Sequence, residues 1–89
     1  MTKGNAPAVS RAWKEGRPMQ GYGALWTTGD TIYSYNLPIG FTAANGDKVV
    51  IEYTRQGSFY SSTTSKHVSQ AHGQRRVMPG DESIPAWMR

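Results

Sequence analysis

Residues 42–54 read TAANGDKVVIEYT. Within this stretch, Asn45-Gly46 is the strongest short-range hairpin signal, because a type I′ turn needs positive φ at both central positions. The residues after the turn alternate between two faces of a strand, with Val49, Ile51 and Tyr53 on one face and Val50, Glu52 and Thr54 on the other. The stretch therefore predicts a β-hairpin whose second strand spans residues 48–54.

Upstream, residues 24–41 read ALWTTGDTIYSYNLPIGF and are rich in β-branched and aromatic side chains. Gly29-Asp30 separates two such runs and predicts another hairpin. Pro38 has no backbone N–H to donate to a neighbouring strand. Residues 33–41 therefore form either an edge strand or two strands joined at a bend in LPIG.

Downstream, Gln56-Gly57 predicts a bend and residues 58–61 a short last strand. Residues 65–72 then predict a helix that Gly73 terminates. Val68 and Ala71 give this helix only a narrow apolar stripe with which to pack on the sheet.

The two ends of the chain have a different composition. Residues 1–23 mix Gly, Pro, Lys and Arg, which predicts a flexible basic arm that Trp13 anchors, although a short helical turn over residues 8–15 is an alternative. Residues 77–89 predict an extended C-terminal tail. Its apolar residues would pack on the same domain or on a neighbouring molecule: Ile84, Trp87 and Met88.

These elements together predict a single α+β domain over residues 24–76. We expect a small twisted antiparallel sheet of three to five strands with one short helix. An SH3-like or Sm-like small barrel is the alternative. Eighty-nine residues suffice for one small domain and are too few for two.

The composition excludes several classes of functional site. The chain has a net charge of +4 and no cysteine, which excludes disulfides, thiolate zinc sites and cysteine nucleophiles. No apolar run is long enough to span a membrane, and the N-terminus lacks the apolar region of a signal peptide. We expect a soluble protein without a membrane partner. Residues 53–80 hold basic side chains and no acid, which favours a polyanionic partner.

The start of the predicted helix is a candidate anion site. Backbone N–H groups at a helix N-terminus have no intrahelical partner and attract anions. The predicted phosphate or nucleic-acid site consists of Thr63, Thr64, Ser65, Lys66, His67, Arg75 and Arg76. The alternative is that the hydroxyls only cap the helix. The segment is not a P-loop, because the glycine before the lysine and the hydroxyl residue after it are missing.

The sequence gives little support for catalysis or for a metal site. On a helix, His67 and His72 would lie about 140° apart, whereas ligands on one face are three or four residues apart. His67 is better interpreted as a hydrogen-bonding residue that holds the preceding loop or reaches the ligand. No motif marks a nucleophilic serine. We therefore expect no metal, no cofactor and no enzymatic activity.

Aromatic side chains offer a second way to contact nucleic acid. Tyr33 and Tyr35 would share a strand face, and Tyr53 would lie near Arg55, so their rings could stack on bases. The alternative is that Tyr33, Tyr53 and Phe59 build the core, because the chain has few aliphatic residues. A protein interface is predicted at Trp13, Ile84, Trp87 and Met88.

Two segments, YSYNLPIGF…NGDKVVIEY and FYSSTTSKHVSQA, together cover about a third of the chain. They resemble a group of very small tailed-bacteriophage proteins of unknown function. In that group a Tyr-x-x-Pro-Ile-small turn precedes a hairpin, and a Tyr-Ser-x-Thr-Thr-Ser-Lys/Arg-His segment starts a helix. The matching residues are Tyr35, Pro38, Ile39, Gly40, Tyr60, Ser61, Thr63, Thr64, Ser65, Lys66 and His67. The resemblance implies a phage gene expressed in a bacterial host and no particular activity.

Two functions follow as expectations. The first is a non-enzymatic phage accessory protein of the host cytoplasm that binds an anionic ligand, either nucleic acid or a nucleotide. The second is a protein-protein interaction module, which would be a host-takeover or anti-defence inhibitor acting on a host protein, or a small self-assembling structural protein. Association with the virion is the alternative location, and a homo-oligomer is compatible with both functions.

Overall fold

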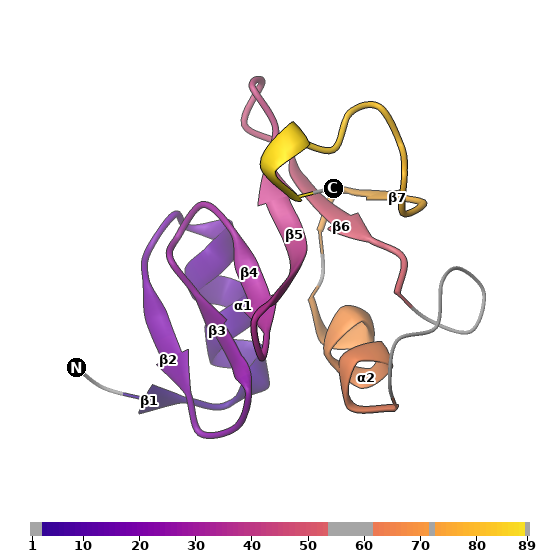
Figure 1. Ribbon diagram of the computed structural model, residues 1–89. Helices are drawn as coiled ribbons and strands as arrows, with labels where there is room; N and C mark the ends of the chain where they lie inside the picture. The colour runs from indigo at the N-terminus through magenta and orange to yellow at the C-terminus, as the bar shows by residue number, and fades with distance from the viewer. Residues whose placement is uncertain (1–2, 54–61, 72, 89) are drawn as a thin grey trace.

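The strands form one sheet in which their spatial order equals their order along the chain (Figure 1). The computed structural model describes residues 3–53, 62–71 and 73–88, and within the second helix it describes side chains from residue 66 onward. The elements of this part of the chain are β1 (Lys3–Gly4), α1 (Ala6–Lys14), β2 (Met19–Gly21), β3 (Leu25–Thr27), β4 (Ile32–Ser34), β5 (Leu37–Thr42), β6 (Lys48–Ile51), α2 (Ser62–Gln70), β7 (Arg75–Val77) and the 3-10 helix η1 (Ala86–Met88).

The sheet is mixed. Strands β2 to β6 are antiparallel neighbours, whereas β1 pairs in parallel with β2, and β6 with β7. Parallel neighbours need a crossover connection, and α1 and α2 provide the two crossovers. The prediction of a three-to-five-stranded antiparallel sheet with one helix is therefore wrong: the described residues form seven strands and two α-helices. The sheet also keeps β1 and β7 as open edges, unlike a closed small barrel.

Helix α1 accounts for much of the difference, because it lies in the segment expected to be a flexible arm. The Asn5 side chain caps it by accepting a hydrogen bond from the Ala8 N–H at 3.0 Å, and Pro7 occupies one of its first positions, where proline is tolerated. Val9, Ala12 and Trp13 recur at helical spacing and are fully buried. Residues 1–23 thus contain β1, α1 and β2, and the boundary at residue 24 does not divide the structure.

The main core lies between the sheet and the two helices, which contact each other on one face of the sheet. Its buried residues are Val9, Trp13, Leu25, Ile32, Ile39, Val50, Val68 and Ala71. The Trp13 ring packs directly on the backbone of Gly40 in β5, where a Cβ atom would lie 2.9 Å from two of its ring carbons. Only glycine allows this approach without displacing the ring.

A smaller core covers the opposite face of β5 and β6. Phe41, Val49, Ile51 and Ile84 are buried there, and Met88 packs against them. Figure 1 shows the C-terminal segment, in yellow, folding back over these two strands. The segment expected to be an extended tail thus contains η1 and packs on its own domain.

The two predicted hairpins are present, as β3–β4 and β5–β6. The turn of the second hairpin differs from the predicted type. β5 ends at Thr42 and β6 begins at Lys48. Because the Ala43 N–H donates to the Asp47 carbonyl at 2.8 Å, the tip of this connection is Ala44, Asn45 and Gly46, of which only Gly46 has positive φ, at 92°. The connection is therefore a three-residue turn closed by glycine and not the expected type I′ turn. Pro38 lies within β5, opposite Tyr33, in the part of the strand that extends beyond its pairing with β6. Neither described α-helix is long and apolar enough to cross a membrane.

Candidate anion-binding site

Helix α2 carries the first part of the predicted site, and its boundaries differ from the expected ones. It runs from Ser62 to Gln70, so it begins and ends earlier than residues 65–72. Gly73 has no positive φ; a Cβ atom there would lie 2.6 Å from the Lys48 carbonyl oxygen, so glycine allows close packing on β6. The side chains of Thr63, Thr64 and Ser65 lie outside the described ones. Lys66 is exposed.

His67 connects α2 to the sheet. Its Nδ1 atom lies 2.7 Å from Oγ of Ser34, a buried residue of β4. Burial, and to a lesser degree the neighbouring Lys66, lower the pKa of His67. The imidazole is therefore neutral at pH 7, a state in which Nδ1 accepts a hydrogen bond from the Ser34 hydroxyl or donates one to it, depending on the tautomer. The described partner of His67 is thus Ser34 of β4, and the loop before the helix lies outside the described residues.

Arg75 and Arg76 lie on a different element from Lys66 and His67. They form part of β7, which begins after the far end of α2. Lys66 and His67 lie in the middle of α2, and four residues separate the end of this helix at Gln70 from Arg75. Arg76 is also engaged, because its guanidinium lies 2.9 Å from the Glu52 carboxylate.

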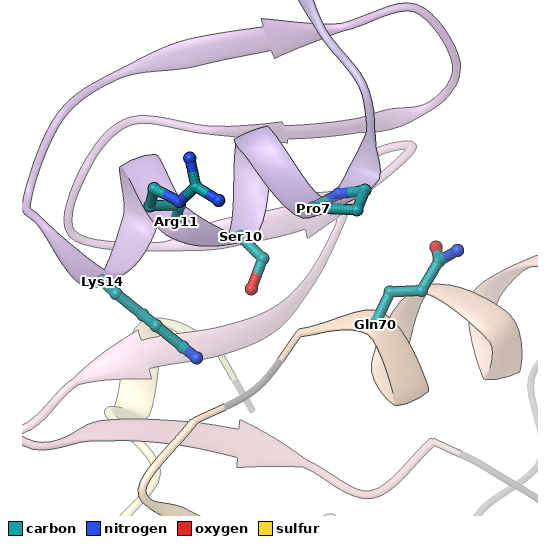
Figure 2. Close-up of a pocket in the computed structure, with 5 residues that line it drawn as sticks. All are labelled: Pro7, Ser10, Arg11, Lys14 and Gln70. Atoms are coloured by element: carbon teal, nitrogen blue, oxygen red, sulfur yellow. The ribbon is translucent and has the colours of Figure 1, made fainter.

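A groove between α1 and α2 gathers charged and polar groups instead. It has a volume of about 360 Å³ and is lined by Pro7, Ser10, Arg11 and Lys14 of α1 and by Gln70 of α2. The four α1 residues follow the i, i+3, i+4, i+7 spacing that marks one face of a helix. Figure 2 shows Ser10 and Lys14 extending from α1, and Gln70 from α2, into the space between the helices.

The groove is electropositive. Arg11 and Lys14 are exposed, and within the described residues neither forms an ion pair. Glu15, the nearest acid along the chain, is paired with Arg17. Lys66 precedes Gln70 by one helical turn, so it lies on the same side of α2. An arginine can bind a phosphate through two parallel hydrogen bonds, and a lysine adds a mobile charge. The groove is therefore suited to a small anion.

The three tyrosines predicted to stack on bases do not form one platform. Tyr33 stacks on Trp26 with ring centroids 4.1 Å apart and an interplanar angle of 7°, so one face of its ring is covered. Tyr53 is half-buried and packs against both cores. Tyr35 does not share a strand face with Tyr33, because it begins the two-residue turn after β4. It is the only exposed ring of the three.

The residues predicted to form a protein interface are also separated. Trp13 is fully buried, and its indole Nε1 donates to the Asp30 carbonyl at 3.0 Å. Ile84 is buried and Met88 half-buried. Trp87 is 62% exposed and alone remains available as an apolar anchor.

Sequence reasoning missed the residues of the groove. Arg11 and Lys14 were assigned to a mobile arm, although the helical spacing of Val9, Ala12 and Trp13 on the other side of the same segment was a usable signal. Gln70 carried no signal, because a lone glutamine at the end of a helix is common on protein surfaces. Within the described residues no three metal-ligating side chains gather.

A second missed residue is Lys48, which is buried. Its Nζ donates to the Thr42 hydroxyl at 2.6 Å and to the Gly29 carbonyl at 3.2 Å, and it lies 5.8 Å from the Trp13 ring centroid. Burial lowers the pKa of Lys48, and Asp30 partly opposes this effect. Lys48 therefore connects the β3–β4 loop to the β5–β6 hairpin.

Comparison with known proteins identifies the family of the chain. No curated protein and no solved structure matches the chain. The profile of a family of unknown function, DUF8033, matches residues 10–84. The matched range includes Ser10, Arg11, Lys14 and Gln70 of the groove and extends from α1 into the C-terminal segment. The chain therefore belongs to the family of unknown function DUF8033.

Proposed function

We propose that this protein binds a phosphate-bearing ligand in the groove between α1 and α2, without catalysing a reaction. One observation carries this proposal: Arg11 and Lys14 both line the groove from the same face of α1. Neither forms an ion pair with a described residue. Two like charges on one helix face repel each other. A bound anion would relieve that repulsion.

The volume of the groove and its polar lining also support a phosphate-bearing ligand. The groove volume of about 360 Å³ lies within the roughly 300–1,000 Å³ range of small-molecule sites. Gln70 adds an amide that can donate and accept hydrogen bonds. The net charge of +4 favours the approach of an anion. In this proposal the protein is a phage accessory protein of the host cytoplasm, with virion association as the alternative.

The test is a titration with ribose 5-phosphate, followed by amide chemical shifts in NMR spectra. Arg11→Gln with Lys14→Gln should weaken binding at least tenfold, because each charge-assisted hydrogen bond contributes about 1.5–3 kcal/mol. The matched control is Lys3→Gln with Arg75→Gln, which removes the same net charge from the two edge strands. Equal losses in both double variants would attribute binding to overall charge and contradict the groove. The absence of any shift in the unsubstituted protein would also contradict it.

The exposed Trp87 and Met78, at 62% and 52%, favour a second candidate, self-association through the C-terminal segment. Large apolar side chains at the surface are common anchors of interfaces. Sedimentation velocity of the full chain should then show a dimer that Trp87→Ser with Met78→Ser converts to a monomer. A monomer at all accessible concentrations of the unsubstituted chain would exclude this candidate.

A further inference from the structure

A second hollow lies at the turn between β4 and β5. It has a volume of about 270 Å³ and is lined by Ser34, Tyr35, Asn36 and Leu37. Ser34 is also the residue that bonds His67 of α2. His67 precedes Gln70 by three residues, a rise of about 4.5 Å along the helix. The hollow and the groove are therefore linked through α2: Ser34, which lines the hollow, contacts His67, and Gln70 of the same helix lines the groove.

Tyr35 has an unusual conformation in this turn. Its φ is 57°, which makes it the single described non-glycine residue with positive φ. Glycine or asparagine normally fills such a turn position, because a bulky side chain is strained there. Two hydrogen bonds fix the backbone: the Tyr35 N–H donates to the Ala24 carbonyl at 3.0 Å, and Trp26 Nε1 donates to the Tyr35 carbonyl at 2.7 Å.

Packing of the Tyr35 ring against the core does not offset this backbone strain. It is 56% exposed and belongs to neither core. Strained residues that stability does not explain tend to occur at ligand sites. An exposed aromatic ring beside a hollow is a surface on which a flat ring can stack, and such stacking is how proteins hold nucleobases.

The neighbouring groups fit the edge of a base. Asn36 follows Tyr35 and is exposed, and its amide offers both donors and an acceptor, the combination that recognises a base edge. The hollow is slightly smaller than the roughly 300 Å³ lower bound of a drug-sized site, so it is suited to one part of a ligand and not to a whole one. The groove between α1 and α2, with its exposed Arg11 and Lys14, is suited to the other part.

From these observations we infer that the ligand is a nucleotide unit, with its phosphate on Arg11 and Lys14 and its base in the hollow against Tyr35. This inference rests on the proposed phosphate site and adds the base to it. A free nucleotide and one unit of a single-stranded nucleic acid share this chemistry.

The experiment compares adenosine 5′-monophosphate with ribose 5-phosphate, which lacks the base, in NMR titrations of the full chain. The nucleotide should bind about 5- to 150-fold tighter, the range that corresponds to the stacking of one base. Tyr35→Asn, which tolerates positive φ and removes the ring, should reduce nucleotide affinity to that of ribose 5-phosphate and leave ribose 5-phosphate binding unchanged. Tyr22→Asn, at a tyrosine that is 77% exposed and does not line the hollow, is the control and should leave both affinities unchanged.

The outcomes separate the two proposals. Equal affinity of the unsubstituted protein for both compounds overturns the base site and leaves the phosphate site standing. Binding of neither compound overturns both. A Tyr35→Asn variant that keeps the unsubstituted protein's preference for the nucleotide also overturns the base site, whereas spectra that show an intact fold and a lost preference support it. A tetranucleotide single strand then identifies the source: tighter binding of the strand indicates nucleic acid, and tighter binding of the monophosphate a free nucleotide.

Discussion

Nδ1 of His67 and Oγ of Ser34 lie 2.7 Å apart, and this hydrogen bond joins α2 to β4 across 33 positions of the sequence. Ser34 is completely buried at this contact. Because Ser34 lines the hollow at the β4–β5 turn and Gln70 of the same helix lines the groove, the bond fixes the helix that borders both.

The first prediction concerns the pH dependence of stability. Burial lowers the pKa of His67 below its value of about 6.5 in the unfolded chain. The neutral imidazole therefore contributes stability that is fully present above pH 6.5 and is lost as the pH falls through the folded-state pKa. We expect the free energy of unfolding, measured with urea, to decrease between pH 7 and pH 5.

A non-titrating substitution provides the control for that prediction. His67→Gln can still hydrogen-bond to Ser34 and should flatten the pH dependence between pH 5 and pH 7. An unchanged slope in His67→Gln would show that other groups determine the acid sensitivity.

The second prediction concerns the contact between Gly40 and Trp13. A Cβ atom at position 40 would lie 2.8 Å from Cγ2 of Ile32 and 2.9 Å from the Trp13 ring. Gly40→Ala should therefore lower the free energy of unfolding by about 1–3 kcal/mol, as overpacking of a core does. Gly23→Ala is the matched control, because nothing lies within 4 Å of a Cβ atom there. Similar urea midpoints for the two variants would contradict the packing described for Trp13.

The third prediction concerns the C-terminal segment. Ile84 is 2% exposed in the smaller core, so Ile84→Ala should cost about 2–5 kcal/mol. Trp87→Ala, three residues further on at an exposed position, should change the free energy of unfolding by less than about 0.5 kcal/mol. Thermal unfolding of the two variants measures both changes in the free energy of unfolding. A neutral Ile84→Ala would mean that the segment does not stabilise β5 and β6.

The sequence of the central hairpin predicts its place and strand faces well, because alternation and turn residues are local signals. Val49 and Ile51 pack in one core and Val50 in the other, as the alternation indicates. The length of the turn was not predictable from Asn45-Gly46 alone, because the same pair also fits a three-residue connection. Both faces of β6 are buried because Ile84, more than thirty positions later in the chain, packs on the face that carries Val49 and Ile51. The sequence of the hairpin contains no signal for this contact.

Helix α1 was predictable in part. Asn5 and Pro7 are ordinary signals of a helix start, yet the glycines and prolines around them favoured an arm. The groove was not predictable, because it depends on which faces of two helices meet, and a sequence segment contains no information on the face of a distant one. Lys48 illustrates the same limit: a lysine at a strand start is usually exposed, and the Thr42 hydroxyl, the Gly29 carbonyl and the Trp13 ring together make a buried one tolerable.

The sequential order of the strands also has a kinetic consequence. Every strand in the described sheet pairs with the strand before or after it in the chain, so no pairing must close a loop around strands that have yet to form. Folding rates rise as contacts become more local. The sheet can therefore grow outward from the short turns beside β5, and the two helical crossovers, which close the longest loops, are expected to add the edge strands last.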